Sequence, residues 1–391
     1  MTVLIDVRLL GTGEYSGVEE YTRHLVSALI SAPGTPTSNV GGSVGAPHRF
    51  LLFTSGLRQV PLPPAWTCHP RVEVINWHFP NKIIDASFRF FNRPALAERY
   101  HADVVLSPHF SYLASGRVPL ILTIHDLSFF HYPEFFSLRQ RLWHFRSASL
   151  QARRAAHVIA DSAFTKSDII SLLNIPAERV PIIFPGLSPE FKLLPADSPE
   201  VSSCLRRRGL SFPYLLFVGS FEPRKNVDGL IRAFSLIKKD SAARDLRLVL
   251  IGGKSWRDDA VTRALHASPH RDDIIIFKNI VPEERVLLYN GASVFVYPSF
   301  FEGFGFPPLE AQACGVPVVA SDRTSLPEVL GNSALLVDPW EINKLADAVV
   351  SILSDKNVSR HLREKGIANA KRFSWPCTAS QILNLISTLP H

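Results

Sequence analysis

Cysteine is scarce in this sequence, and long apolar runs are missing. The 391 residues include four cysteines, which lie far apart and form no Cys-x-x-Cys pair. This pattern predicts neither a zinc cage nor a disulfide framework, and reduced thiols are typical of a cytoplasmic protein. No stretch of the sequence reaches the roughly 18 consecutive apolar residues that a membrane-spanning helix requires. We therefore expect any membrane contact to be peripheral, at the inner membrane face.

Two further signatures are missing. The first predicted strand is followed by RLLGTGEYSGVEE, without a tight Gly-x-Gly-x-x-Gly motif that opens a helix, which argues against a nicotinamide-dependent oxidoreductase. The formal net charge of +7 favours anionic ligands such as phosphorylated metabolites, nucleic acid or an acidic membrane surface. Because no helix-turn-helix, zinc finger or basic tail is present, we do not expect nucleic acid as a partner.

What the sequence does contain is a large share of apolar residues in short runs. The apolar fraction is 46%, enough for two buried cores, and the length exceeds that of a usual single domain. Short β-branched runs alternate with helical patterns, which predicts an α/β fold with parallel strands. The predicted strands cover residues 3–5, 50–53, 72–75, 104–106, 120–124, 158–160, 180–183, 214–218, 247–251, 274–277, 294–297, 318–320 and 335–337.

A polar segment divides the chain. Residues 187–213 contain four prolines and several serines, with no strand pattern before Tyr214, which is typical of a linker between domains. We therefore predict a first domain over residues 1–195 and a second over 196–373. Doubly wound domains of this kind bind ligands at the carboxyl ends of their strands.

The densest candidate site is SFFEGFGFPPLEAQACGVPVVAS, residues 299–321. Glu302 is followed by flexible glycines, and the Pro-Pro pair at 307–308 favours a helix start that would put Glu310 in the first turn. A helix N-terminus attracts phosphate, and carboxylates accept hydrogen bonds from vicinal hydroxyls. This combination suits a nucleotide sugar. Alternatively, Glu310 only complements the helix dipole and Glu302 is solvated.

Three other segments place polar groups or glycine next to predicted strands and helices. Arg224 and Lys225 follow the strand that ends at Val218, where adjacent cations could neutralise a pyrophosphate. His125 and Asp126 follow another strand, where they could orient a sugar or assist proton movement. Gly17 precedes a helix and would allow close approach of a ligand. Each also has a plain structural interpretation: solvated cations, a hydrogen-bonded pair and an ordinary helix start.

Together these segments resemble glycosyltransferase family 4. The resemblance covers nearly the whole chain in the expected order, and its most specific part is the pair of glutamates in EGFGFPPLE. The segments that carry it are SGVEEYTRHL, TIHDLSFFHYPE, ADSAFTKSDI, FVGSFEPRKNVDGLIRAF, LYNGASVFVYPSFFEGFGFPPLEAQACGVPVVAS and the closing FSW. The resemblance implies a GT-B fold, in which two Rossmann-like domains face a deep cleft and the final helix, residues 374–391, returns to the first domain.

The resemblance also implies a chemistry and a role for individual residues. Sugar transfer would proceed from a nucleotide diphosphate with retention of configuration, and neither a cofactor nor a metal would be needed. The catalytic residues implied are Glu302, His125 and Lys225. The donor-binding residues implied are Gly17, Ser220, Arg224, Lys225, Val281, Gly303, Phe304, Gly305, Phe306 and Glu310. Ser220 departs from the family pattern, which often has arginine there, so Arg224 would supply the second positive charge.

The acceptor is expected on the first domain. Its candidate contacts are His109, Asp126 and Tyr132. Between Phe136 and Ala156 the sequence has five arginines and no acidic residue, interleaved with aromatic and aliphatic side chains. This pattern predicts a basic helix with two interpretations. It could touch an anionic membrane that carries a lipid-linked acceptor, or it could be a solvated face that packs its aromatics inward.

These observations predict a retaining glycosyltransferase that moves a hexose from a nucleotide-diphosphate sugar, with a GDP-mannose-like donor favoured, to a glycan or lipid-linked saccharide. The alternative is a non-catalytic nucleotide-sugar-binding or partner subunit of a glycan-synthesis complex. Both keep the same donor site, because sequence shows site residues and not turnover.

Overall fold

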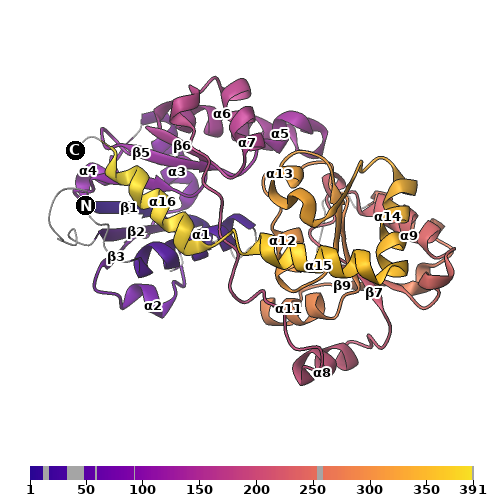
Figure 1. The fold of residues 1–391 in the computed structure, drawn as a ribbon. Coiled ribbons are helices and arrows are strands. Elements are labelled where there is room, and N and C mark those ends of the chain that lie inside the picture. Colours follow the sequence, from indigo (N-terminus) through magenta and orange to yellow (C-terminus); the bar gives the residue numbers. More distant parts are fainter. Residues whose placement is uncertain (12–16, 33–47, 58–59, 92, 253–258, 390–391) are drawn as a thin grey trace. The chain divides into compact units, whose positions relative to one another are not determined.

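The chain forms two compact units (Figure 1). The computed structural model describes residues 1–11, 17–32, 48–57, 60–91, 93–252 and 259–389. One unit, called unit N, comprises Met1–His131, Phe136–Gly186 and Ser374–His391; the other, unit C, comprises Tyr132–Phe135 and Leu187–Phe373. The main passage of the chain from unit N to unit C therefore comes after Gly186. This is earlier than the boundary at residue 195 that the linker composition predicts.

Each unit contains one six-stranded sheet, and its paired strands are parallel. In unit N the order is β3-β2-β1-β4-β5-β6, and in unit C it is β12-β11-β10-β7-β8-β9. The strands are β1 (Thr2–Asp6), β2 (Arg49–Ser55), β3 (Val72–Trp77), β4 (Val104–Ser107), β5 (Leu120–Ile124), β6 (His157–Ala160), β7 (Tyr214–Val218), β8 (Arg247–Ile251), β9 (Ile274–Phe277), β10 (Val294–Tyr297), β11 (Val318–Ser321) and β12 (Leu335–Val337).

Both sheets have the same doubly wound order, so each has one point at which the winding direction reverses. That point lies between β1 and β4 in unit N and between β7 and β10 in unit C. Open α/β sheets bind ligands in the crevice outside the carboxyl ends of the strands at this position. The fold therefore directs attention to the residues that follow these four strands.

The predicted α/β fold is confirmed, with one wrong strand. Residues 180–183 form only an isolated bridge between Ile182 and Ala160. The amide of Ala160 donates to the carbonyl of Pro181, and the amide of Ile183 donates to the carbonyl of Ala160. Pro181 has no amide hydrogen, so the ladder cannot be extended along this segment.

Helices cover the sheets of both units (Figure 1). Those of unit N are α1 (Gly17–Ser31), α2 (Pro64–Thr67), α3 (Asn81–Phe91), α4 (Leu96–Arg99), α5 (Ser128–His131), α6 (Leu138–Arg154), α7 (Ala163–Leu173) and α16 (Trp375–Ser387). Those of unit C are α8 (Pro199–Arg207), α9 (Val227–Ile237), α10 (Asp259–Ala267), α11 (Pro282–Asn290), α12 (Phe306–Ala313), α13 (Leu326–Leu330), α14 (Ile342–Ser354) and α15 (Lys356–Ala370).

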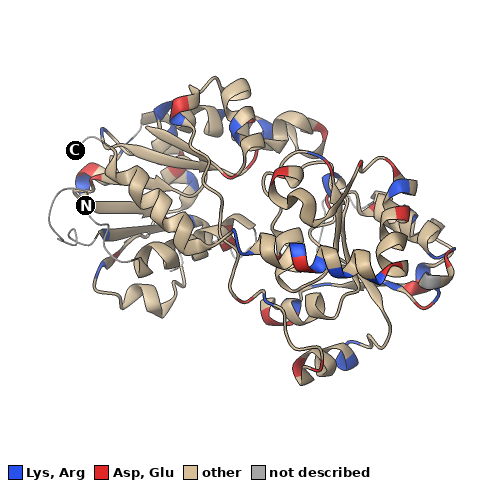
Figure 2. Cartoon of the chain, in the orientation of Figure 1, with Lys and Arg blue, Asp and Glu red and all other residues tan. Residues whose placement is uncertain are grey.

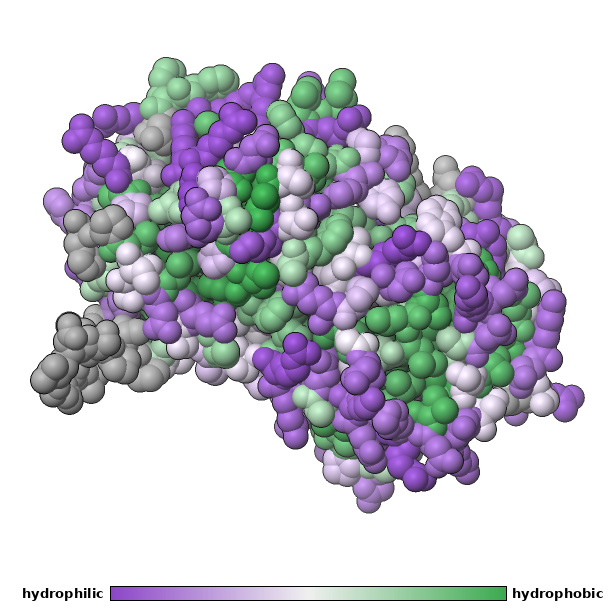
Figure 3. Space-filling view, turned by 45° about the horizontal axis from the view of Figure 1, so that its top comes forward, coloured by the Kyte–Doolittle hydropathy of each residue, from purple (hydrophilic) through white to green (hydrophobic). Residues whose placement is uncertain are grey.

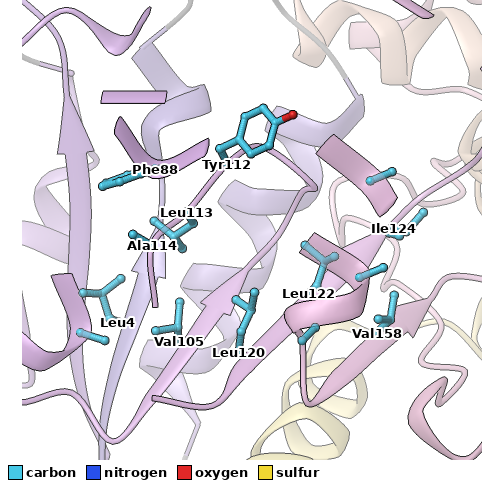
Figure 4. Packing of buried hydrophobic residues seen from close by; sticks show 14 of the residues in the cluster. Leu4, Phe88, Val105, Tyr112, Leu113, Ala114, Leu120, Leu122, Ile124 and Val158 are labelled. Carbon is cyan, nitrogen blue, oxygen red and sulfur yellow. The ribbon is translucent and has the colours of Figure 1, made fainter. Parts of the chain in front are cut away.

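The core of unit N has two hydrophobic clusters, to which alternate residues of the strands contribute. Leu4 of β1 belongs to one cluster, together with Phe88 of α3 and Ala148 of α6. Figure 4 shows the packing of this cluster, in which Val105 of β4 and Leu120 of β5 also take part. Strands buried on both faces are expected in a parallel sheet covered by helices on both sides.

The second cluster brings the end of the chain onto unit N. It joins Val3 and Ile5 of β1 to side chains of α1 and α16, which lie side by side in Figure 1. The final helix thus contributes to the core of the unit that contains the first strand. The crossing is tight at Gly186, where an added Cβ would lie 2.1 Å from the backbone nitrogen of Trp375, so only glycine fits there.

Candidate active site

A buried ion pair lies at the reversal point of the unit C sheet. Lys225 Nζ donates to Glu302 Oε1 at 2.6 Å and to the Tyr297 hydroxyl at 2.7 Å. Lys225 is 7% exposed and Glu302 is 6% exposed. Lys225 ends the short helix η4 (Pro223–Lys225) after β7, whereas Tyr297 ends β10 and Glu302 follows it. The segments that follow the two strands at the reversal point thus supply one charge each.

The backbone of Glu302 is fixed by the segment that follows β11. Its amide donates to Thr324 Oγ1 at 3.0 Å, and Ser325 Oγ donates to the carbonyls of Glu302 and Phe304, both at 3.0 Å. These bonds hold the loop after β10 against the segment after β11. They use only the backbone of Glu302, so its carboxylate is available to bind Lys225. The alternative that Glu302 is merely solvated is wrong.

Burial and neighbouring charges shift the pKa values of both members of this pair. Burial alone would raise the pKa of Glu302, but the charges of Lys225 and Arg224 outweigh it and lower that pKa below its ordinary value. Burial, followed by the neighbouring charge of Arg224, lowers the pKa of Lys225, while Glu302 opposes the shift. Removing one partner would leave an uncompensated buried charge, which commonly costs about 3–5 kcal/mol.

Arg224 and Ser220 meet at a third acidic residue, Glu222. Arg224 Nε donates to Glu222 Oε2 and Ser220 Oγ donates to Glu222 Oε1, both at 2.7 Å. Arg224 also reaches the Phe301 carbonyl at 3.1 Å and Glu302 Oε2 at 3.5 Å. The side chains predicted to bind the donor, Ser220 and Arg224, therefore join the Lys225–Glu302 pair in one network, through a carboxylate that the sequence analysis did not identify.

The glycine-rich loop leads directly into α12. Gly305 adopts a left-handed conformation with φ 103°, and an added Cβ would lie 2.6 Å from Leu326 Cδ2, so the turn requires glycine. Gly303 and Phe304 are buried in this loop, and Phe306 begins the helix. The prolines that follow lie in the first turn, as predicted.

Glu310 lies beyond the first turn of α12, so its predicted place at the helix start is wrong. The helix begins at Phe306, before the prolines, and its first turn holds no acidic residue. Glu310 is buried, accepts a hydrogen bond from the Tyr289 hydroxyl at 2.7 Å and lies 3.6 Å from Arg285. Its role is therefore not that of a dipole complement. Both partners come from α11, whose N-cap, Val281, is 54% exposed.

His125 occupies a defined position in unit N. Its Nδ1 lies 2.6 Å from Asp161 Oδ2, and its Nε2 lies 2.8 Å from the carbonyl oxygen of Pro108. A carbonyl only accepts, so Nε2 carries a proton, and the carboxylate favours a second proton on Nδ1. Burial lowers the pKa of His125, but the charge of Asp161 and both hydrogen bonds outweigh it and raise the pKa. These surroundings thus favour the protonated form of His125.

Of the other residues predicted for the first domain, His109 and Asp126 lie close enough to His125 to interact with it electrostatically. His109 is buried, and burial lowers its pKa to about 4, so it is neutral at pH 7. Asp126 accepts hydrogen bonds from the amide and hydroxyl of Ser128 at the start of α5. Gly17 is the exposed first residue of α1, and residues 12–16 before it lie outside the described residues. Tyr132 belongs by its contacts to unit C.

Several residues of the site escaped the sequence analysis. Asp161 lies 36 residues from His125 along the chain and belongs to the segment ADSAFTKSDI, but no role was predicted for it. Tyr289 and Arg285 had a detectable signal, because they are spaced four apart on one helix and therefore share a face. Tyr297 is the last residue of a predicted strand that is buried throughout, so the sequence gives no sign that its hydroxyl binds Lys225.

Two doubly wound units, with ionised side chains at the reversal point of the second, define the GT-B class of glycosyltransferases. The family models agree with this class. The model described as "Glycosyltransferase Family 4" matches residues 15–191, and that described as "Glycosyl transferases group 1" matches residues 207–372. The chain belongs to glycosyltransferase family 4 and is a glycosyltransferase.

Relatives and solved structures support this assignment. O-antigen chain mannosyltransferase B of Escherichia coli is 35% identical over 300 residues, which cover 76% of this chain and 77% of the relative. O-antigen chain mannosyltransferase RfbU of Salmonella typhimurium is 27% identical over 239 residues, covering 60% and 62% of the two chains.

Among solved structures, the fold is similar to that of sucrose-phosphate synthase from Thermosynechococcus elongatus, with a TM-score of 0.75 and 21% identity over 99% of this chain and 98% of that chain. The fold is also similar to that of Anabaena Alr3699/HepE in complex with UDP-glucose, with a TM-score of 0.73 and 20% identity over 100% of both chains. Both comparisons show the GT-B fold.

The His125–Asp161 pair makes a direct prediction. In the variant Asp161→Asn the pKa of His125 should fall below its ordinary value of about 6.5, because burial then acts without the opposing charge. NMR titration of the His125 ring, assigned with His125→Gln, measures this pKa. Asp168→Asn, which removes the carboxylate paired with His131, is the matched control. An unchanged His125 pKa in Asp161→Asn would contradict the assignment.

Proposed function

We propose that this glycosyltransferase moves mannose, with retention of configuration, from GDP-mannose or a closely similar donor to a glycan or lipid-linked saccharide. The observation that carries the proposal is the buried Lys225–Glu302–Arg224 network at the reversal point of unit C. Support for mannose comes from the names of relatives, which include two O-antigen chain mannosyltransferases. By this analogy, the acceptor is a growing O-antigen-like polysaccharide.

In this proposal the donor lies along the carboxyl edge of the unit C sheet. Lys225 and Arg224 neutralise the diphosphate, with the amides of Phe304, Gly305 and Phe306 at the start of α12 adding their dipoles. Glu310 accepts hydrogen bonds from the ribose hydroxyls. The base lies against residues 278–281, which lead from β9 to the exposed N-cap of α11. Gly17 of unit N approaches the phosphates.

Glu302 has two tasks in this arrangement. It holds the ammonium of Lys225 in place through the 2.6 Å bond, and its carboxylate accepts hydrogen bonds from hydroxyls of the transferred sugar. A carboxylate whose pKa is lowered stays ionised at neutral pH, so it remains an acceptor throughout. Gly303 next to it leaves room for the sugar.

The proposed reaction proceeds by front-face attack. The bond between the anomeric carbon and the diphosphate oxygen breaks, the acceptor oxygen bonds to the same carbon, and the acceptor proton passes to the departing phosphate oxygen. No protein base is required. His125 suits this scheme because both of its ring nitrogens already face acceptors and its pKa is raised, so the protonated ring adds positive charge near the leaving group rather than acting as a base. Neither a metal nor a cofactor is required in this scheme, because the cations of the chain neutralise the diphosphate.

The acceptor is proposed to reach the enzyme on a membrane surface through α6. Within the part of the chain that the structure describes, no helix is long and apolar enough to span a membrane. In α6, Ser147 and Ala148 pack inward, while Leu138, Leu142 and Phe145 are 68%, 47% and 48% exposed. Their spacing of four and three residues places them on one exposed stripe.

Positive charge surrounds this stripe. Five arginines of α6 are all exposed: Arg139, Arg141, Arg146, Arg153 and Arg154. Blue segments mark the basic residues of this helix in Figure 2. Figure 3 turns this part of the surface forward and shows hydrophobic and hydrophilic side chains intermixed there. Phe136 and Trp143 do pack on the core, so the inward-packing interpretation holds for them but not for the stripe. An apolar stripe among arginines matches an anionic membrane.

The catalytic assignment predicts that Lys225→Ala lowers kcat/KM for GDP-mannose by about 100- to 1,000-fold, since the leaving diphosphate loses a buried cation. Lys344→Ala, which removes an exposed lysine, is the control. Because Glu302 would keep, among the described residues, only the more distant Arg224, at 3.5 Å, as a cationic partner, the double variant Lys225→Met/Glu302→Leu should recover thermal stability without activity. Wild-type kcat/KM in Lys225→Ala would contradict the proposal, as would full activity with UDP-glucose and none with GDP-mannose.

The membrane assignment predicts that the protein sediments with vesicles containing phosphatidylglycerol, less so at 0.5 M salt, and not with purely zwitterionic vesicles (at about 0.5 M the Debye length is only about 4 Å). The double variant Leu142→Ser/Phe145→Ser should lose this binding. Leu193→Ser, at an exposed position in unit C, should keep it. If the wild type fails to sediment, or the double variant binds equally well, the membrane role of α6 is wrong.

A further inference from the structure

Trp340, three residues after the end of β12, exposes an indole ring next to the candidate active site. Its side chain is 69% exposed, and its ring stacks on Phe300 at a centroid distance of 4.2 Å and an angle of 29°. Phe300 covers one face of the indole, so the exposed area includes the opposite face. By contrast, Trp66 and Trp375 are 3% and 6% exposed. A large aromatic ring held flat and open to solvent has no role in a core.

We propose that Trp340, supported by Phe300, is a stacking platform for a sugar ring of the acceptor. The proposal rests on the proposed function, because it names where unit C would hold the saccharide that receives the transferred mannose. The axial and equatorial C–H groups of a pyranose form an apolar face that packs on an aromatic ring, and the hydroxyls at its rim need polar partners.

The platform is fixed to the catalytic network by backbone hydrogen bonds. The amide of Phe300 donates to the carbonyl of Arg224 at 2.7 Å, and Arg224 donates to the carbonyl of Phe301 at 3.1 Å. On the other side, Asn226 Nδ2 donates to the Pro339 carbonyl, just before Trp340, at 2.9 Å. Both rings of the stack are therefore tied to the segment that carries Lys225.

Polar side chains lie at the rim of this platform. Asp338 accepts a hydrogen bond from the Trp340 amide at 3.0 Å and forms an ion pair with Arg323. Their side chains are 29% and 49% exposed, respectively. The Tyr132 hydroxyl lies 3.5 Å from the carbonyl of Phe300, the other ring of the stack. A carboxylate, a guanidinium and a phenol beside an open aromatic face are the groups that bind saccharide hydroxyls.

Sheet order distinguishes this platform from a site for the nucleotide base. The base is assigned to residues 278–281, which follow β9, whereas Trp340 follows β12. These strands are the two opposite edges of the unit C sheet, and β7 and β10 with the Lys225–Glu302 pair lie between them. A donor whose base lies at the β9 edge and whose diphosphate lies at the centre directs its sugar end toward β12. The acceptor must meet that end.

The test uses the full-length protein and two separate readouts. In a ¹⁵N-labelled sample, the indole N–H resonance of Trp340, assigned with Trp340→Leu, should shift on titration with a mannose disaccharide and should not shift with GDP alone. In transfer assays from GDP-mannose to mannose oligosaccharides, Trp340→Leu should raise the acceptor KM about tenfold and leave kcat and the donor KM within about twofold. Trp340→Tyr should recover part of the loss, and Leu193→Ser should match the wild type.

The outcomes separate the two proposals. A disaccharide that leaves the Trp340 resonance unmoved, or an unchanged acceptor KM in Trp340→Leu, would overturn the platform even if GDP-mannose is the donor. A shift with GDP instead would make Trp340 a base-stacking residue and would also overturn it. A shift with disaccharide, in a protein that neither binds GDP nor transfers mannose, would retain the platform and reject the proposed donor.

Discussion

The Lys225–Glu302 ion pair is the interaction on which the rest of the site depends. Two opposite charges, each less than a tenth exposed, must be paired or their burial would be prohibitively costly. Their pairing joins the loop after β7 to the loop after β10, and through Thr324 and Ser325 to the segment after β11. Three loops from three strands are thereby held in one arrangement before any ligand arrives, which is the preorganisation that charge stabilisation requires.

The doubly wound sheet explains why these loops are neighbours. Parallel strands bring all their carboxyl ends to one edge, and the reversal between β7 and β10 leaves a crevice between the helices that follow them. Unit N repeats the same strand order. Its His125–Asp161 pair lies just after the ends of β5 and β6, which are neighbours in the sheet. The two units thus present different chemistry: a buried lysine with its carboxylate in one, and a charged imidazole in the other.

Much of the fold could be predicted because strands buried on both faces leave a clear trace in the sequence, such as Leu120–Ile124. The wrong strand at residues 180–183 is also apolar and β-branched, but Pro181 lacks the amide that the ladder would need there. The partners of the site were harder to predict. Lys225 and Glu302 are 77 residues apart, and Asp161 pairs with His125 only because β5 and β6 are adjacent. Glu310 was misplaced because α12 starts before its prolines.

The central claim is that Lys225 is placed for a diphosphate, and calorimetry tests it most directly. Affinities of GDP and GMP should be measured for the wild type and for Lys225→Met. The account predicts that the wild type binds GDP at least about tenfold more tightly than GMP, and that Lys225→Met removes most of this difference while its affinity for GMP hardly changes. An equal preference for GDP over GMP in both proteins would contradict the account.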